Sequence, residues 1–136
     1  MEIAGFEFQV VDADGCRIIE SIYPSTVDIS KLSSVIATYY DLWDEEIPTA
    51  ALTNLSKLES LDGELRNILS SVIGRTVLQA SFVGAAWFTV GREQLADDLR
   101  TLLRSVGRPD DNVFESRDDA VAFLRGKFAE RQSSGA

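Results

Sequence analysis

Apolar residues recur along the chain with two different periods, and the alternation of these periods predicts the order of its elements. Every second residue is apolar from Phe6 to Val10, which predicts a half-buried strand over residues 5–11. A turn signal follows at residues 12–15, and residues 16–23 are again rich in apolar side chains. The opening of the chain therefore predicts a β-hairpin.

Four later segments carry apolar residues three or four positions apart, which is the period of a helix with one buried face. We expect these helices at about 26–44, 61–74, 92–106 and 116–131. The short apolar segments that separate them are predicted to be strands, at 49–55, 82–90 and 112–114. The run at 82–90 is almost unbroken, which is typical of a strand covered on both faces. Residues 75–79 fit neither period.

The last strand leads directly into the last helix, and this step carries a clear helix start. Ser116 is a good N-cap residue, and Asp119, three positions later, is an acidic residue in the first turn. Arg125 and Arg131 lie near the other end, where basic side chains suit the helix dipole.

The predicted order is β-β-α-β-α-β-α-β-α, which indicates the α/β fold class. We expect a mixed sheet of four to five strands, mostly parallel after the N-terminal hairpin, with four packed helices. Residues 1–131 form a single domain in this interpretation. The polar residues 132–136 are predicted to be a disordered tail.

Composition narrows the class of protein. The chain has 136 residues and 45% hydrophobic residues, which suits one ordinary globular domain. Its formal charge of −9 disfavours nucleic acid as a partner, because phosphate backbones repel an acidic surface. Since no segment reads as a signal peptide or membrane span and Cys16 is the one cysteine, we expect a cytoplasmic protein.

The chain offers little catalytic chemistry. It contains no histidine, which removes the usual proton carrier and the commonest metal ligand. Its paired acids are adjacent in sequence, so on a helix they point away from each other. We therefore expect no enzyme activity, no catalytic residue, no metal site and no cofactor.

Two sets of residues are candidates for ligand binding. Gly91 and Arg92 follow a strand at its carboxyl end, where open α/β sheets bind ligands, and Arg92 could hold an anion. Aromatic residues at helical and strand positions could line an apolar cavity: Tyr39, Tyr40, Trp43, Trp87 and Phe88. The alternative is that Arg92 is a solvated turn residue and that the aromatic side chains are plain core.

Three stretches together resemble a known family. They are the central strand and loop at 50–58, the strand-to-helix step at 82–103, and a phenylalanine-containing strand followed by an acid-acid-alanine helix at 112–124. They are similar to the STAS domains, in particular the SpoIIAA-like relatives of bacterial anti-sigma-factor antagonists. The resemblance implies a bacterial regulatory module with this α/β fold.

The resemblance also implies a site. In regulatory STAS domains a partner kinase phosphorylates a serine in the loop after the central strand, beside an aspartate. Here Asn54 stands in place of that acid, and Ser56 and Ser60 are the candidate serines for phosphorylation or partner binding. The alternative is that both serines are turn and N-cap residues.

We therefore expect a non-enzymatic STAS-like regulatory or protein-interaction module with a protein partner. The alternative function is the binding of a small apolar or lipid-like ligand, with peripheral membrane association. The helix that carries Tyr40 and Trp43 is acidic at its end, which suits anionic lipid poorly. The oligomeric state is left open.

Overall fold

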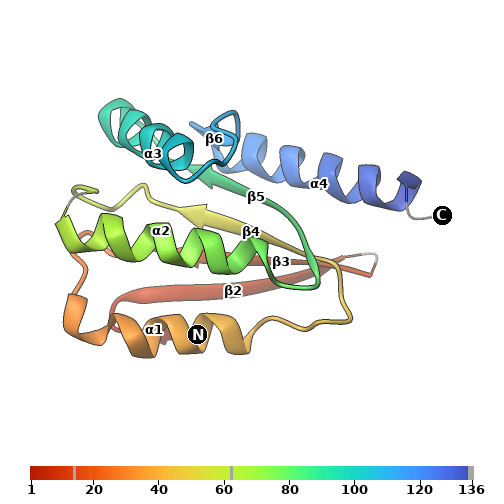
Figure 1. Ribbon diagram of the computed structural model, residues 1–136, viewed down its shortest axis with the longest axis horizontal. Coiled ribbons are helices and arrows are strands. Elements are labelled where there is room, and N and C mark those ends of the chain that lie inside the picture. The colour runs from red at the N-terminus through yellow and green to blue at the C-terminus, as the bar shows by residue number, and fades with distance from the viewer. Residues whose placement is uncertain (14, 62, 135–136) are drawn as a thin grey trace.

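One six-stranded sheet forms the centre of the molecule in a computed structural model, which describes residues 1–13, 15–61 and 63–134 (Figure 1). The strands lie side by side in chain order: β1 (Glu2–Ile3), β2 (Phe6–Ala13), β3 (Cys16–Ile22), β4 (Thr49–Asn54), β5 (Phe82–Phe88) and β6 (Val113–Phe114). The first three strands are antiparallel, and β3 to β6 are parallel. The fold is therefore the mixed α/β fold that the sequence predicts.

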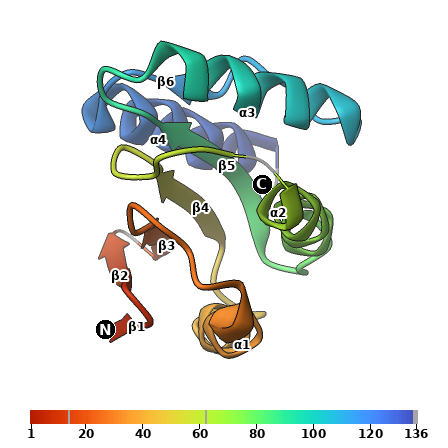
Figure 2. The same cartoon turned by 90° about the vertical axis from the view of Figure 1, so that its left-hand side faces the viewer.

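Helices cover the two faces of the sheet unequally. Their bounds are η1 (Ile29–Lys31), α1 (Leu32–Asp41), α2 (Gly63–Val77), α3 (Glu93–Ser105) and α4 (Arg117–Ser134). The larger apolar core joins α1, α2 and α3 to one face, while α4 packs on the other. In the end-on view of Figure 2, α1 and α2 lie on one side of β4 and β5, and α4 lies on the other.

The register of the parallel strands assigns each side chain to one of these two cores. Leu52 lies opposite Ala86, and Trp87 lies opposite Val113. Because side chains alternate along a strand, Leu52 and Ala86 face α4, whereas Trp87 and Val113 face the larger core. The parallel core expected from the three apolar segments is confirmed.

Small residues on β5 let α4 approach the sheet closely. A Cβ placed on Gly84 would stand 3.1 Å from Cγ and 3.3 Å from Cβ of Lys127 on that helix. A side chain at position 84 would therefore push against the aliphatic stem of Lys127. Gly84 thus allows α4 to lie close to the sheet at this point.

The sheet has six strands where the sequence predicts four to five, because β1 is too short to show an apolar period. Strand β1 pairs with β2 through a tight turn. Ala4 (φ 52°) and Gly5 (φ 87°) both have positive φ in this turn, as in other hairpin turns. The turn predicted at 12–15 includes residue 14, which lies outside the described residues.

Helix ends also differ from the expectation. The first helical segment begins as the short η1, where Asp28 accepts a hydrogen bond from the Ser30 amide, and α1 ends at Asp41 rather than near residue 44. Residues 75–77 of the ambiguous segment join α2, which runs to Val77, and residues 78–79 form a turn. The predicted cap of α4 is confirmed, because the Asp119 amide donates to Ser116 Oγ at 3.1 Å.

The C-terminal helix extends beyond its predicted end. It continues to Ser134, three residues into the tail that the sequence predicts to be disordered, and residues 135–136 lie outside the described residues. In the described part of the chain, no helix has the length and apolar character needed to cross a bilayer.

Candidate functional site

The first candidate site lies where the parallel strands β4 and β5 end. Their carboxyl ends are adjacent in the sheet, so the loop after β4 meets the loop after β5. Ligands of open α/β sheets bind outside the carboxyl ends of the strands. We call these two segments, 54–60 and 89–92, the paired loops.

Hydrogen bonds join the paired loops to each other. Asn54 Oδ1 accepts from the Ser56 amide at 2.9 Å, which forms the tight turn after β4. Ser56 Oγ accepts from the Val90 amide of the other loop at 3.1 Å. The Arg92 guanidinium donates to the carbonyl oxygens of Ser56 (3.4 Å) and Glu59 (2.8 Å). The sequence candidates Asn54, Ser56 and Arg92 thus belong to one network.

The neighbouring candidates complete the same surface. Gly91 has a φ of +68°, a conformation that suits glycine, and it turns the chain from β5 into α3. Ser60 is exposed in the first loop and takes no part in the hydrogen bonds described above. Val90 is 57% exposed and adds an apolar side chain to this surface. Sequence reasoning missed Val90 as a surface residue because it ends a buried run.

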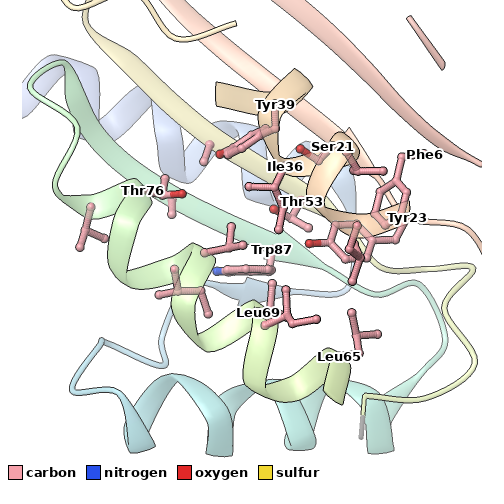
Figure 3. A pocket seen from close by; sticks show the side chains of 18 of the residues that line it. Phe6, Ser21, Tyr23, Ile36, Tyr39, Thr53, Leu65, Leu69, Thr76 and Trp87 are labelled. Atoms are coloured by element: carbon pink, nitrogen blue, oxygen red, sulfur yellow. The ribbon is translucent and has the colours of Figure 1, made fainter. Parts of the chain in front are cut away.

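The second candidate site is a cavity of about 70 Å³ between the sheet and the helices α1 and α2 (Figure 3). Its walls are mostly apolar, with Phe6, Leu65, Leu69 and Ile73 among them. Trp87, an aromatic candidate from the sequence, also lines the cavity. The cavity opens partly to solvent, so it combines an apolar interior with a route of entry.

Tyr39 lines the cavity as well, but the structure does not gather the other three aromatic candidates around it. Phe88 faces α4 on the opposite side of the sheet. Tyr40 turns its hydroxyl to the Val72 carbonyl and the Thr76 hydroxyl, both at 3.0 Å, so it ties α1 to α2. Trp43 packs edge-on against Tyr39, which does line the cavity.

Polar groups enter the cavity wall at several points. Ser21 and Thr53 are buried and line it from β3 and β4. Tyr23 and Tyr39 line it as well, and burial raises the pKa of both phenols above the ordinary range, so they remain protonated. Thr53 follows three apolar residues on β4, and this polar position was the sequence signal that could have identified it.

Two further ionisable side chains are engaged in structural contacts. Glu20 on β3 is 3% exposed, and it accepts hydrogen bonds of 2.8–3.2 Å from the Arg117 guanidinium at the start of α4. Cys16 is half-buried, with Gln132 Nε2 at 3.9 Å from its sulfur. Among the described residues, no group of three or more potential metal ligands comes together.

Comparison with solved structures places this architecture among known folds. An anti-sigma factor antagonist from Mycobacterium paratuberculosis superimposes with a TM-score of 0.58, over 88% of this chain and 94% of the other. The chain has an STAS-like fold. The two sequences are 18% identical, so the likeness concerns the fold. No protein-family model matches the sequence, and no curated protein matches it.

Proposed function

We propose that the STAS-like chain is a non-enzymatic regulatory module that binds a protein partner through the paired loops. The observation that carries this proposal is the Ser56–Val90–Arg92 network, which holds two separate loops as one preformed surface. A preformed surface loses little conformational freedom on binding, which favours affinity.

The composition of this surface supports a protein partner. Val90 presents an apolar side chain that is 57% exposed, and the exposed Lys57, Glu59 and Ser60 lie in the loop beside it. An apolar centre with a polar rim is the usual make-up of a protein interface. The solved neighbour of the same fold is named as an antagonist of an anti-sigma factor.

In this proposal a partner kinase can regulate the surface by phosphorylating Ser56 or Ser60. Ser56 Oγ now accepts the Val90 amide hydrogen, and Arg92 now donates to two carbonyl oxygens. A phosphate on Ser56 would compete for both donors, because charge-assisted hydrogen bonds are stronger than neutral ones. Modification would then change the hydrogen bonds that join the paired loops, and with them the shape of the docking surface.

The test is capture of partners by the purified chain, followed by titration of the captured protein against variants. We expect Val90→Asp to weaken partner binding at least about tenfold, because it puts a charge at the apolar centre. Leu78→Asp is the matched control, since Leu78 is 82% exposed but lies between the end of α2 and the start of β5, away from the paired loops at the other end of the strands. Loss of binding in the Leu78 variant but not in the Val90 variant would overturn the paired loops as the docking surface.

Two further variants separate docking from regulation. Ser56→Ala and Ser60→Ala test the kinase step by phosphate incorporation from the native cell extract. Unchanged incorporation in the double variant would remove the phosphoswitch and leave the docking surface in place.

A second candidate function rests on the cavity of about 70 Å³. In this proposal a small, mostly apolar ligand occupies the space between the sheet and α1 and α2. Native mass spectrometry of protein purified from its own cells tests it, and the expected result is a complex heavier than the bare chain. The formal charge of −9 disfavours an anionic membrane as the source of that ligand.

A further inference from the structure

Two residues that line the cavity each carry a buried polar atom without a hydrogen-bond partner among the described residues. The two atoms are Trp87 Nε1 and Asn112 Oδ1. Water cannot replace the partner easily, because Trp87 is only 6% exposed and Asn112 only 8% exposed. Leaving such atoms unsatisfied costs about 1–3 kcal/mol each, so native structures pair nearly all of them. Both residues line the same cavity.

From these two atoms we infer that the cavity holds a small neutral molecule with an apolar body and a hydroxyl or primary amide group at one end. This inference rests on the cavity as a ligand site, the second function proposed above. The group would accept a hydrogen bond from Trp87 Nε1 and donate one to Asn112 Oδ1.

The two atoms belong to residues whose backbones are adjacent in the structure. The Trp87 amide donates to the Asn112 carbonyl at 3.0 Å, which holds the two backbones side by side. The Asn112 side chain donates through Nδ2 to the Ala85 carbonyl at 2.9 Å. That bond uses the amide nitrogen and leaves Oδ1 as the free acceptor. Figure 3 shows the Trp87 nitrogen at the end of the ring turned away from Tyr23.

Complementarity to one donor and one acceptor favours a neutral group. A carboxylate could pair with the Arg108 guanidinium, which also lines the cavity, but it has no proton to donate to the Asn112 oxygen and would place its charge against that atom. An ammonium group would meet the Trp87 N–H and the same guanidinium. A hydroxyl or primary amide satisfies both free atoms without a buried charge.

The volume sets the size of the molecule. A single water needs about 10–15 Å³ of such space, and a cavity of about 150 Å³ binds benzene. The cavity here measures about 70 Å³. It has room for more than a bridging water, and for a body of a few carbon atoms beside the polar group.

The two tryptophans of the chain provide a direct readout, because each gives one indole N–H signal in a ¹H–¹⁵N NMR spectrum. The wild-type chain is titrated separately with butan-1-ol, butanoate and xenon, and Trp43→Phe assigns the two signals. We expect butan-1-ol to shift the Trp87 signal saturably, and butanoate to bind at least about tenfold more weakly because of its charge.

Variants test the proposed contact itself. Trp87→Phe keeps an aromatic ring but removes the N–H, and we expect it to weaken butan-1-ol binding about tenfold, followed by the methyl signals of Leu69 and Ile73. Trp43→Phe is the control, because Trp43 lies outside the cavity, and it should leave the affinity unchanged. The methyl spectrum of each variant also reports whether it is folded.

The outcomes separate this inference from the function on which it rests. Butanoate binding as tightly as butan-1-ol overturns the neutral class of ligand. Methyl shifts with xenon, without a Trp87 shift from butan-1-ol, keep the cavity as an apolar site and overturn the polar contact. If neither xenon nor butan-1-ol binds, both the inference and the ligand-binding function fail.

Discussion

Glu20 is a carboxylate within the sheet, and its environment depends on one side chain from a distant part of the sequence. Arg117 donates to both carboxylate oxygens from the first turn of α4. These hydrogen bonds to Glu20 raise the pKa of the Arg117 guanidinium. Arg117 itself is about half exposed. The pair therefore links β3 to α4 at the rim of the smaller core.

Replacing Arg117 by alanine should destabilise the fold, because it leaves a buried carboxylate without its partner. We expect a loss of about 2 kcal/mol in the free energy of unfolding, at the low side for buried pairs since Arg117 is partly solvated. Urea unfolding at pH 7 measures it.

Arg125→Ala on the exposed side of the same helix is the control, with an expected change of less than about 0.5 kcal/mol. Adding Glu20→Gln to the Arg117 variant should recover part of the loss. Equal stability of the two arginine variants would contradict this account of Glu20.

At the scale of elements, the contact between β5 and α4 depends on the absence of a side chain at Gly84. The aliphatic stem of Lys127 occupies the space that a Cβ would take. Gly126, the residue before Lys127 on α4, differs in this respect, because a Cβ added there would meet no neighbouring atom within 4 Å.

The two glycines should therefore respond to alanine with opposite signs. We expect Gly84→Ala to destabilise the protein by about 1 kcal/mol through overpacking, and Gly126→Ala to stabilise it by about 0.5–1 kcal/mol through helix propensity. Thermal unfolding followed by circular dichroism measures both.

A double variant isolates the contact. Lys127→Ala shortens the side chain beside position 84, so Gly84→Ala should cost less in that background. An unchanged cost would show that the close approach of Lys127 does not constrain β5.

Most elements could be predicted from the sequence because their apolar periods are long and regular. The strands at 49–54 and 82–88 and the helix α3 are examples, and their predicted order determines the parallel core. The strand β1 could not be predicted, since two residues show no period. The end of α2 was ambiguous because residues 75–77 join the helix without extending its apolar stripe clearly.

The candidate sites were harder to predict, because a site depends on distances between loops. The proximity of Ser56 and Arg92 follows from strand order, and the resemblance and the strand-end rule each pointed to one of them. The involvement of Asn112 in the cavity was not visible, since its free oxygen is defined by the bond of Nδ2 to Ala85. Phe88 looked equivalent to Trp87 until the register placed them on opposite faces.

At the scale of the whole molecule, the larger core encloses tyrosine hydroxyls beside its cavity. Burial raises the pKa of Tyr23 and Tyr39, whereas tyrosine in an unfolded chain ionises near about pH 10. Above that pH the unfolded chain loses protons that the folded chain keeps. Stability that is fully present below about pH 10 is therefore lost as the pH rises toward the folded-state values.

We expect the free energy of unfolding to fall by about 1 kcal/mol per pH unit for each of these tyrosines above about pH 10. Urea unfolding between about pH 8 and pH 11 measures the slope. The double variant Tyr23→Phe with Tyr39→Phe should flatten it, because only Tyr40 of the three tyrosines is left. The same slope in wild type and double variant would contradict the role given to burial.

The sheet ends at both margins in a strand of two residues, β1 and β6. A strand that pairs with a foreign chain needs a longer row of free backbone groups, and short outer strands are one way in which proteins avoid such pairing. Beyond β1, however, residues 9–13 of β2 pair with no described strand on their outer side, and Val10 and Val11 there are 40% and 42% exposed. This uncovered stretch of β2 is therefore the place where a foreign strand would add to the sheet, with Asp12 as the charge that opposes it.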